Sequence, residues 1–145
     1  MVALASDHAG FAYKERLKPL LDQLKIDYRD YGAHTSDSTD YPDWAHPACG
    51  AISSGTCERG IFICGTGIGM SIIANKHLGI RAAACESVEA ARLARLHNNA
   101  NVLAFGERLL RWEAVVEIVT IFLQTPFEGG RHERRIQKIH ALTQL

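Results

Sequence analysis

The sequence has 145 residues, the usual size of one domain, and its 16 basic side chains balance 16 acidic ones. This balance argues against a partner recognised by charge, such as nucleic acid or an anionic membrane surface. No apolar run approaches about 18 residues and no basic, apolar leader precedes the first strand, so we expect a cytoplasmic protein without a membrane span. The four cysteines form no Cys-x-x-Cys pair, which argues against a structural zinc site and fits a reducing compartment.

Short apolar runs alternate with segments of helical periodicity. In chain order, the pattern predicts a strand at 2–5, a helix at 11–24, a strand at 26–31, a polar loop at 33–41 and a helix at 42–54. A strand at 60–64, a helix at 69–77, a strand at 80–85, a helix at 89–96 capped by Ser87, a strand at 101–105 and helices at 111–123 and 130–145 follow. Strands that alternate with helices imply right-handed crossovers. We therefore expect one α/β domain over residues 1–145, a three-layer α/β/α sandwich around a mostly parallel sheet of about five strands.

The segment IFICGTGIGMS at residues 61–71 places Gly65, Gly67 and Gly69 directly after a strand. Such glycines let backbone N–H groups converge on an anion, and the next helix adds its positive N-terminal end. The anion could be the phosphate of a dinucleotide, with Glu86 on a ribose hydroxyl, or a developing oxyanion. Met70 stands where the dinucleotide motif has its third glycine, and the loop is the third rather than the first strand-to-helix turn, so the oxyanion interpretation is favoured.

Cys64 ends the same strand, immediately before the glycines. Amides and a helix start favour the thiolate form of a cysteine, and a thiolate here could take a proton from a carbon beside a carbonyl. The loop amides could hold the resulting oxyanion. Cys49, Cys57 and Cys85 lack such a setting and are expected to be buried hydrophobic residues.

Polar side chains also follow other predicted strands. Ligands of open parallel sheets bind at the carboxyl ends of the strands, which makes Asp7, His8, Tyr41 and Arg108 candidates for the same site.

Two further groups of candidates lie at predicted helix ends. Arg131 and Arg135 are four residues apart, on one helix face and about 6 Å from each other, which suits a phosphate clamp but also a solvated basic face near Glu133. His97 and Asn98 end the helix before the last strand, where they could move a proton and donate from an amide, or could serve only to end the helix.

Six motifs in order resemble the B type of ribose-5-phosphate isomerase, a family that also holds galactose-6-phosphate and allose-6-phosphate isomerases. They are SDHAG at 6–10, DYPD at 40–43, ICGTGIGMSIIANK at 63–76, GIRAA at 79–83, HNNANVLAFGER at 97–108 and EGGRHERR at 128–135. The resemblance implies a Rossmann-like fold without a nucleotide, and a homodimer that can pair into a tetramer, with active sites between subunits. It implies interconversion of ribose 5-phosphate and ribulose 5-phosphate through a cis-enediolate, without metal or cofactor. An isomerase of a six-carbon sugar phosphate is the near alternative, and a non-catalytic nucleotide-binding module is the remoter one.

The same resemblance implies a role for each candidate residue. Cys64 is similar to the family's general base. The enediolate would be held by Thr66, Asn98 and the loop amides, those of Gly65, Gly67, Gly69 and Ser71 among them. Asp7 and His97 resemble the groups that open the sugar ring and bind its hydroxyls, with Tyr41 lining the site. The phosphate would be bound by His8, Arg108, Arg131 and Arg135.

Overall fold

The computed structural model describes all 145 residues and shows a single sheet of five parallel strands. The strands are β1 (Val2–Ser6), β2 (Tyr28–Asp30), β3 (Arg59–Cys64), β4 (Ala82–Ala84) and β5 (Val102–Gly106). They lie in the order β2-β1-β3-β5-β4. From β1 the chain adds β2 on one side of the sheet and then β3 on the other side of β1. The direction in which successive strands are added therefore reverses between β1 and β3. A ligand crevice is expected there, at the carboxyl ends of these two strands.

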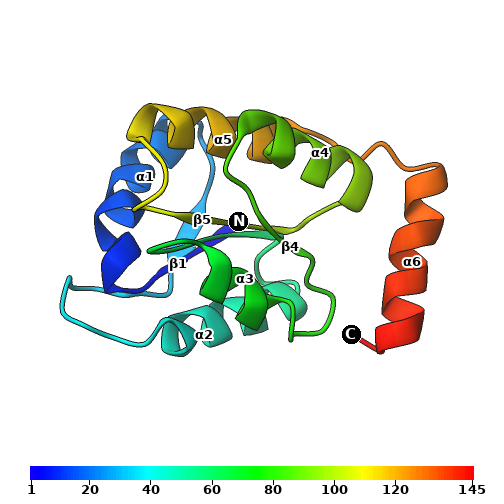
Figure 1. Cartoon of the computed structure of the whole chain (residues 1–145), viewed down its shortest axis with the longest axis horizontal. Helices are drawn as coiled ribbons and strands as arrows, with labels where there is room; N and C mark the ends of the chain where they lie inside the picture. The colour runs from blue at the N-terminus through cyan, green and yellow to red at the C-terminus, as the bar shows by residue number, and fades with distance from the viewer.

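Helices cover both faces of the sheet (Figure 1). They are α1 (Phe11–Gln23), α2 (Tyr41–Ser53), α3 (Ile68–Ala74), α4 (Val88–Asn98), α5 (Trp112–Gln124) and α6 (Arg131–Thr143), with a short 3-10 helix, η1 (His8–Gly10), before α1. None of them combines the length and the apolar character that crossing a bilayer requires.

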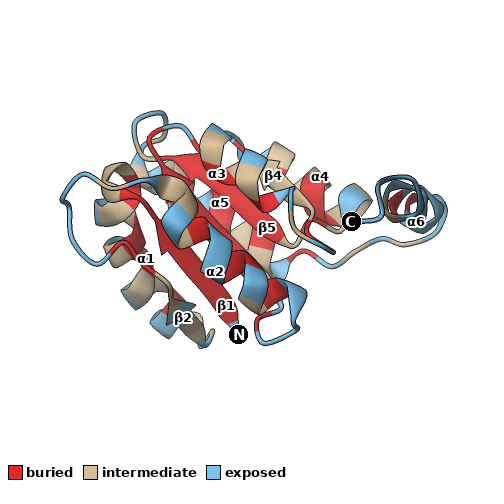
Figure 2. Ribbon diagram, turned by 90° about the horizontal axis from the view of Figure 1, so that it is seen from below, coloured by how far each residue is buried: buried red, intermediate tan, exposed pale blue.

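The core consists of two apolar layers, one on each face of the sheet. Successive residues of a strand point to opposite faces. Leu4, Ile61, Ile63 and Leu103 therefore pack against α1, α4 and α5, whereas Ala3, Phe62, Cys64 and Ala104 pack against α2 and α3. The central strands are buried on both faces, as Figure 2 shows, and this explains why they are continuously apolar rather than alternating.

Helix α6 stands apart from the sandwich at one end of the molecule (Figure 1). Only His132 and Ile136 of this helix are buried, and Figure 2 shows it as mostly exposed. Its apolar side chains Ile139 and Leu142 are 47% and 75% exposed. An amphipathic helix with an uncovered apolar side is typical of a surface that meets a partner.

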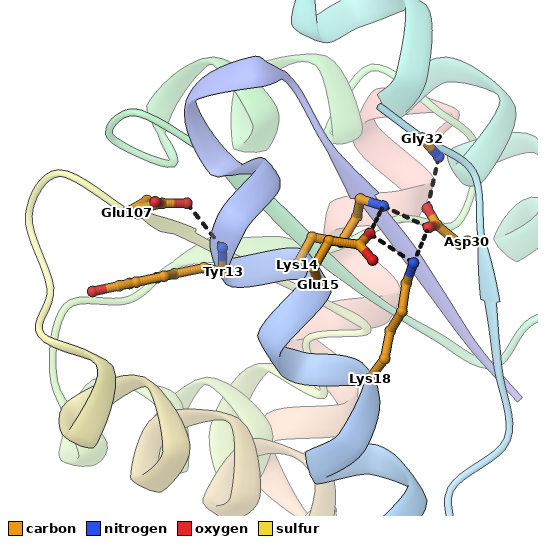
Figure 3. Close-up of polar contacts among 7 residues, drawn as sticks. All are labelled: Tyr13, Lys14, Glu15, Lys18, Asp30, Gly32 and Glu107. Carbon is orange, nitrogen blue, oxygen red and sulfur yellow. Dashed lines mark hydrogen bonds and ion pairs between the residues drawn. The ribbon is translucent and has the colours of Figure 1, made fainter. Parts of the chain in front are cut away.

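A partly buried ion-pair cluster joins α1 to the end of β2 (Figure 3). Lys14 is fully buried, and its Nζ lies 2.5 Å from Asp30 and 3.0 Å from Glu15. Lys18 contacts the same two carboxylates. Burial alone would raise the pKa of Asp30, but hydrogen bonds from Lys14 and Lys18 outweigh it and lower that pKa. Asp30 also accepts from the backbone N–H of Gly32 at 2.8 Å, so the cluster anchors the start of the loop that leads to α2.

The sequence-based fold prediction is confirmed, with a sheet that is entirely rather than mostly parallel. Every predicted strand and helix is present, with ends that differ by a few residues. Ser87 caps α4 as expected, since its Oγ accepts from the N–H of Ala90 at 3.1 Å. Helix η1 was not expected.

Candidate active site

The loop after β3 brings a backbone donor to the sulfur of Cys64. Cys64 Sγ accepts a hydrogen bond from the N–H of Gly67 at 3.1 Å. Gly67 has a φ of 80°, and a Cβ there would lie 2.6 Å from the Cα of Phe105, so only glycine fits. A hydrogen bond of this kind stabilises negative charge on the sulfur. Burial raises the pKa of Cys49 to about 12 and that of Cys85 to about 11, as expected of core thiols.

The end of β1 places a carboxylate beside this loop. Asp7 is 7% exposed, and its Oδ1 accepts from the N–H groups of Ala9 at 2.9 Å and Gly10 at 3.1 Å. Its own N–H donates to the carbonyl of Ile63. A Cβ at Gly10 would lie 2.6 Å from the same carbonyl oxygen, so glycine allows the turn to approach β3 closely. Since Oδ1 takes both backbone donors, Oδ2 is left for a ligand hydroxyl.

The long loop before α2 brings His8 and Tyr41 to the same edge. His8 Nδ1 contacts the backbone of Thr39, at 3.1 Å from its carbonyl oxygen and 3.2 Å from its nitrogen. The ring of Tyr41 packs on Gly69 at the start of α3, where a Cβ would lie 2.7 Å from the tyrosine Cζ. The glycine therefore makes room for the aromatic ring.

The end of β5 covers the other side of the glycine loop. The guanidinium of Arg108 lies over Gly65, where a Cβ would be only 3.2 Å from it. The backbone N–H of Arg108 donates to the Gly65 carbonyl. Thr66 packs against Gly106, and its Oγ1 accepts from the N–H of Ile68 at 3.3 Å. The hydroxyl of Ser71 donates to the carbonyl of Ile68.

Ten of the predicted site residues therefore lie at the carboxyl edge of the sheet. This carboxyl-edge group consists of Asp7, His8, Tyr41, Cys64, Gly65, Thr66, Gly67, Gly69, Ser71 and Arg108.

The other four lie at the opposite edge, and within one chain the structure does not bring them to Cys64. Helix α4 leaves the carboxyl end of β4 and runs back along the sheet, so His97 and Asn98 reach the amino edge. The carbonyl of Asn98 there accepts from Nε of Arg81, the residue before β4. Helix α6, which packs on α4, carries Arg131 and Arg135. We call His97, Asn98, Arg131 and Arg135 the amino-edge group.

Two residues that the sequence did not single out surround His97. Its ring stacks on that of His132, with centroids 4.3 Å apart and planes inclined by 9°. The Nε2 atoms of His97 and His132 lie 3.7 Å and 3.9 Å from the carboxylate of Glu128. Burial, with the nearby His97 and Arg131, lowers the pKa of His132. Glu128 and His132 lie within the EGGRHERR motif, but nothing in the sequence connects that motif to the end of α4.

No cavity of a single chain encloses the carboxyl-edge group. A cavity of about 330 Å³ lies between β4 and α6 and includes Asn98, whereas none of the three cavities in the chain includes Cys64. Small-molecule sites usually enclose most of their ligand, so Cys64 lacks the walls of a finished pocket.

Comparison with known proteins places these residues in context. The ribose/galactose isomerase family matches residues 2–139. "Putative sugar phosphate isomerase YwlF" of Bacillus subtilis is 50% identical over 95% of this chain and 93% of its own. Ribose-5-phosphate isomerase B of Escherichia coli is 42% identical over 99% of this chain and 96% of its own. The solved structure of ribose-5-phosphate isomerase B from Clostridium thermocellum superimposes with a TM-score of 0.96 at 43% identity, over 99% of this chain and 97% of the other.

Proposed function

Because the chain belongs to the ribose/galactose isomerase family, we propose that it interconverts ribose 5-phosphate and ribulose 5-phosphate through a cis-enediolate, with Cys64 as the general base. The family relationship supports the isomerisation of a phosphorylated sugar. The observation that supports the finer proposal is the 3.1 Å contact between Cys64 Sγ and the Gly67 N–H, at the edge of the sheet where ligands bind.

In the proposed chemistry, the thiolate of Cys64 removes the proton on C2 of the open-chain aldose. The C2–H electron pair becomes the C1–C2 double bond, and the carbonyl oxygen on C1 takes the negative charge. The N–H groups of the glycine loop and the hydroxyl of Thr66 stabilise this enediolate, at about 3–4 kcal/mol for each well-placed donor. The proton on sulfur then passes to C1 while a proton moves from O2 to O1, which gives the ketose. Asp7, through its free Oδ2, orients the substrate hydroxyls.

A second copy of the chain completes each site in this proposal. His97 of that copy opens the furanose ring and Asn98 donates to the enediolate. Arg131 and Arg135 join His8 and Arg108 around the phosphate. Three observations support this arrangement, namely the two groups on opposite edges of one chain, the lack of a cavity beside Cys64 and the uncovered apolar side of α6. The homodimer, or a tetramer built from two such dimers, is therefore the proposed active form.

The substitution Cys64→Ala tests the proposal. We expect kcat to fall by at least about 100-fold, the usual contribution of a positioned base, while ribose 5-phosphate still binds. Cys85→Ala, which removes a core thiol on the opposite face of the sheet from Cys64, is the matched control and should keep most of the activity. A Cys64→Ala protein with near-wild-type kcat would show that the base lies elsewhere.

The preferred sugar is a separate question within the same chemistry. Measuring kcat/KM for ribose 5-phosphate, allose 6-phosphate and galactose 6-phosphate compares the five-carbon substrate with six-carbon ones, and we expect ribose 5-phosphate to be preferred. The nucleotide-binding alternative has little support, because Met70, at the third-glycine position of the dinucleotide motif, is a fully buried core side chain. Equilibrium dialysis against NAD and ATP should detect no micromolar binding.

A further inference from the structure

A cluster of three metal-binding side chains lies at the amino edge of the sheet. His97 lies in the last turn of α4, Glu128 lies in the loop after α5, and His132 is in the first turn of α6. One ligand atom from each residue lies within 4.8 Å of the other two. The carboxylate of Glu128 is 3.7 Å from Nε2 of His97 and 3.9 Å from Nε2 of His132.

The Nε2 atom of His132 is buried and has no hydrogen-bond partner. His132 is only 6% exposed, and an unpaired buried polar atom is costly unless a ligand, water or ion satisfies it. This atom points toward the carboxylate of Glu128 without reaching hydrogen-bond distance.

Backbone contacts hold the three residues together. The N–H of Glu128 donates to the carbonyl of Leu96 at 3.1 Å, which fixes the loop beside the last turn of α4. Buried Arg95 donates to the carbonyls of Ala100 and Thr125 and ties the end of α4 to the end of α5. Gly129 and Gly130 have φ of 71° and 58° and turn the chain sharply into α6. The cluster therefore rests on fixed backbone rather than on three mobile side chains.

We propose that His97, Glu128 and His132 bind one Zn²⁺ ion per chain. Two imidazoles and one carboxylate are a common zinc ligand set that leaves the fourth tetrahedral position open, and nitrogen ligands favour Zn²⁺ over Mg²⁺. With bonds of about 2.1 Å, tetrahedral ligand atoms lie roughly 3.4 Å apart. Because the parallel stack of His97 on His132 keeps the two Nε2 lone pairs from converging, binding requires the partly exposed His97 ring to turn out of the stack while the exposed Glu128 adjusts. Arg131 and Arg135 carry positive charge nearby, and because they repel a cation we expect Zn²⁺ to bind more weakly here than in a zinc enzyme.

Binding of this ion has a consequence for catalysis that rests on the proposed function. Zn²⁺ on Nε2 of His97 removes the lone pair with which this residue exchanges protons during ring opening. Zinc is then a reversible inhibitor of the isomerase, acting on the amino-edge group rather than on Cys64.

Isothermal titration of the metal-free protein with Zn²⁺ tests the site without reference to activity. We expect one ion per chain, and a visible absorption band of tetrahedral Co²⁺ when that ion is used instead. His132→Ala and Glu128→Gln should each weaken binding at least about tenfold; Glu128 is exposed, so the second variant does not threaten folding. His46→Ala is the matched control, because it breaks the only other close histidine pair, in which Nδ1 of His46 lies 2.8 Å from Nε2 of His77. Absence of binding to the wild-type protein, unchanged binding to both cluster variants, or loss of binding in the control would overturn the proposal.

Activity is measured separately. Zinc should lower the turnover of the wild-type protein, EDTA should restore it, and Glu128→Gln should resist inhibition at the same zinc concentration. Equal inhibition of Glu128→Gln would place the inhibitory ion elsewhere and overturn this part. A metal-free protein without isomerase activity would contradict the proposed function, while the zinc titration would still decide the metal site.

Discussion

The substitution Gly67→Ala tests the claim that the N–H of residue 67 can reach Cys64 Sγ only because this position has no side chain. The left-handed conformation of Gly67, with φ of 80°, costs a residue with a Cβ about 1–2 kcal/mol. The added Cβ would also lie 2.6–2.8 Å from the N, Cα and C atoms of Phe105, which are backbone of a central strand and cannot turn away. Overpacking of this kind typically costs about 1–3 kcal/mol, so the free energy of unfolding should fall by roughly 2–5 kcal/mol.

Gly55→Ala is the matched control. Gly55 has nearly the same φ, 78°, but nothing lies within 4 Å of its Cβ position. Both substitutions restrict the unfolded chain equally, so the difference between them isolates the contact with Phe105. Urea unfolding followed by circular dichroism, at one protein concentration, should show Gly67→Ala to be less stable than Gly55→Ala by about 1–3 kcal/mol. Equal stabilities within about 0.5 kcal/mol would refute the reasoning.

Two further predictions concern the ion pairs and the phosphate. Asp30→Asn should cost about 2–3 kcal/mol of stability, less than the loss of a whole buried pair because Glu15 still contacts Lys14. The pKa of Asp30 is lowered in the folded protein, so the difference in the free energy of unfolding between the wild-type and Asp30→Asn proteins should be full above about pH 5 and shrink as the pH falls below about 4. A constant difference in urea titrations across that pH range would contradict this prediction. Arg135→Ala should raise KM for phosphorylated substrates about tenfold or more, and for unphosphorylated sugars hardly at all, whereas Arg134→Ala on the same helix should change neither. An equal effect of Arg135→Ala on both kinds of sugar would remove this residue from the phosphate site.

The central part of the fold could be predicted from the sequence because its signals are local. The apolar run that ends at Cys64 and the glycines after it identify a buried strand and a tight turn, and the structure shows both. The edge strand β4 is shorter than predicted, Ala82–Ala84 instead of residues 80–85. It pairs only with β5, and the side chain of Arg81 before it bonds the carbonyls at the end of α4. Helix η1 follows from the capping carboxylate of Asp7, a signal that hydrophobic periodicity does not contain.

The relation between the two groups of site residues could not be predicted in the same way. Their separation depends on the direction in which α4 returns and on β5 lying between β3 and β4, which is a property of the whole sheet. The stacking of His97 on His132 joins segments that are far apart in the sequence, and no pattern of spacing links them. The family resemblance supplied roles for His97 and Arg131 and implied active sites between subunits, but which residues lie on which edge of one chain follows only from the topology.

Mixing two inactive variants tests the shared active site most directly. Cys64→Ala changes the carboxyl-edge group and His97→Ala changes the amino-edge group, so in a hybrid dimer one site carries both changes and the other carries neither. If subunits are refolded together in equal amounts, half of the dimers are hybrids, and about one quarter of wild-type activity should return. A mixture of Cys64→Ala with Asp7→Ala, both in the carboxyl-edge group, should stay inactive. Recovery in the first mixture alone is the result we predict; a first mixture as inactive as its two parents would contradict an active site built from two chains.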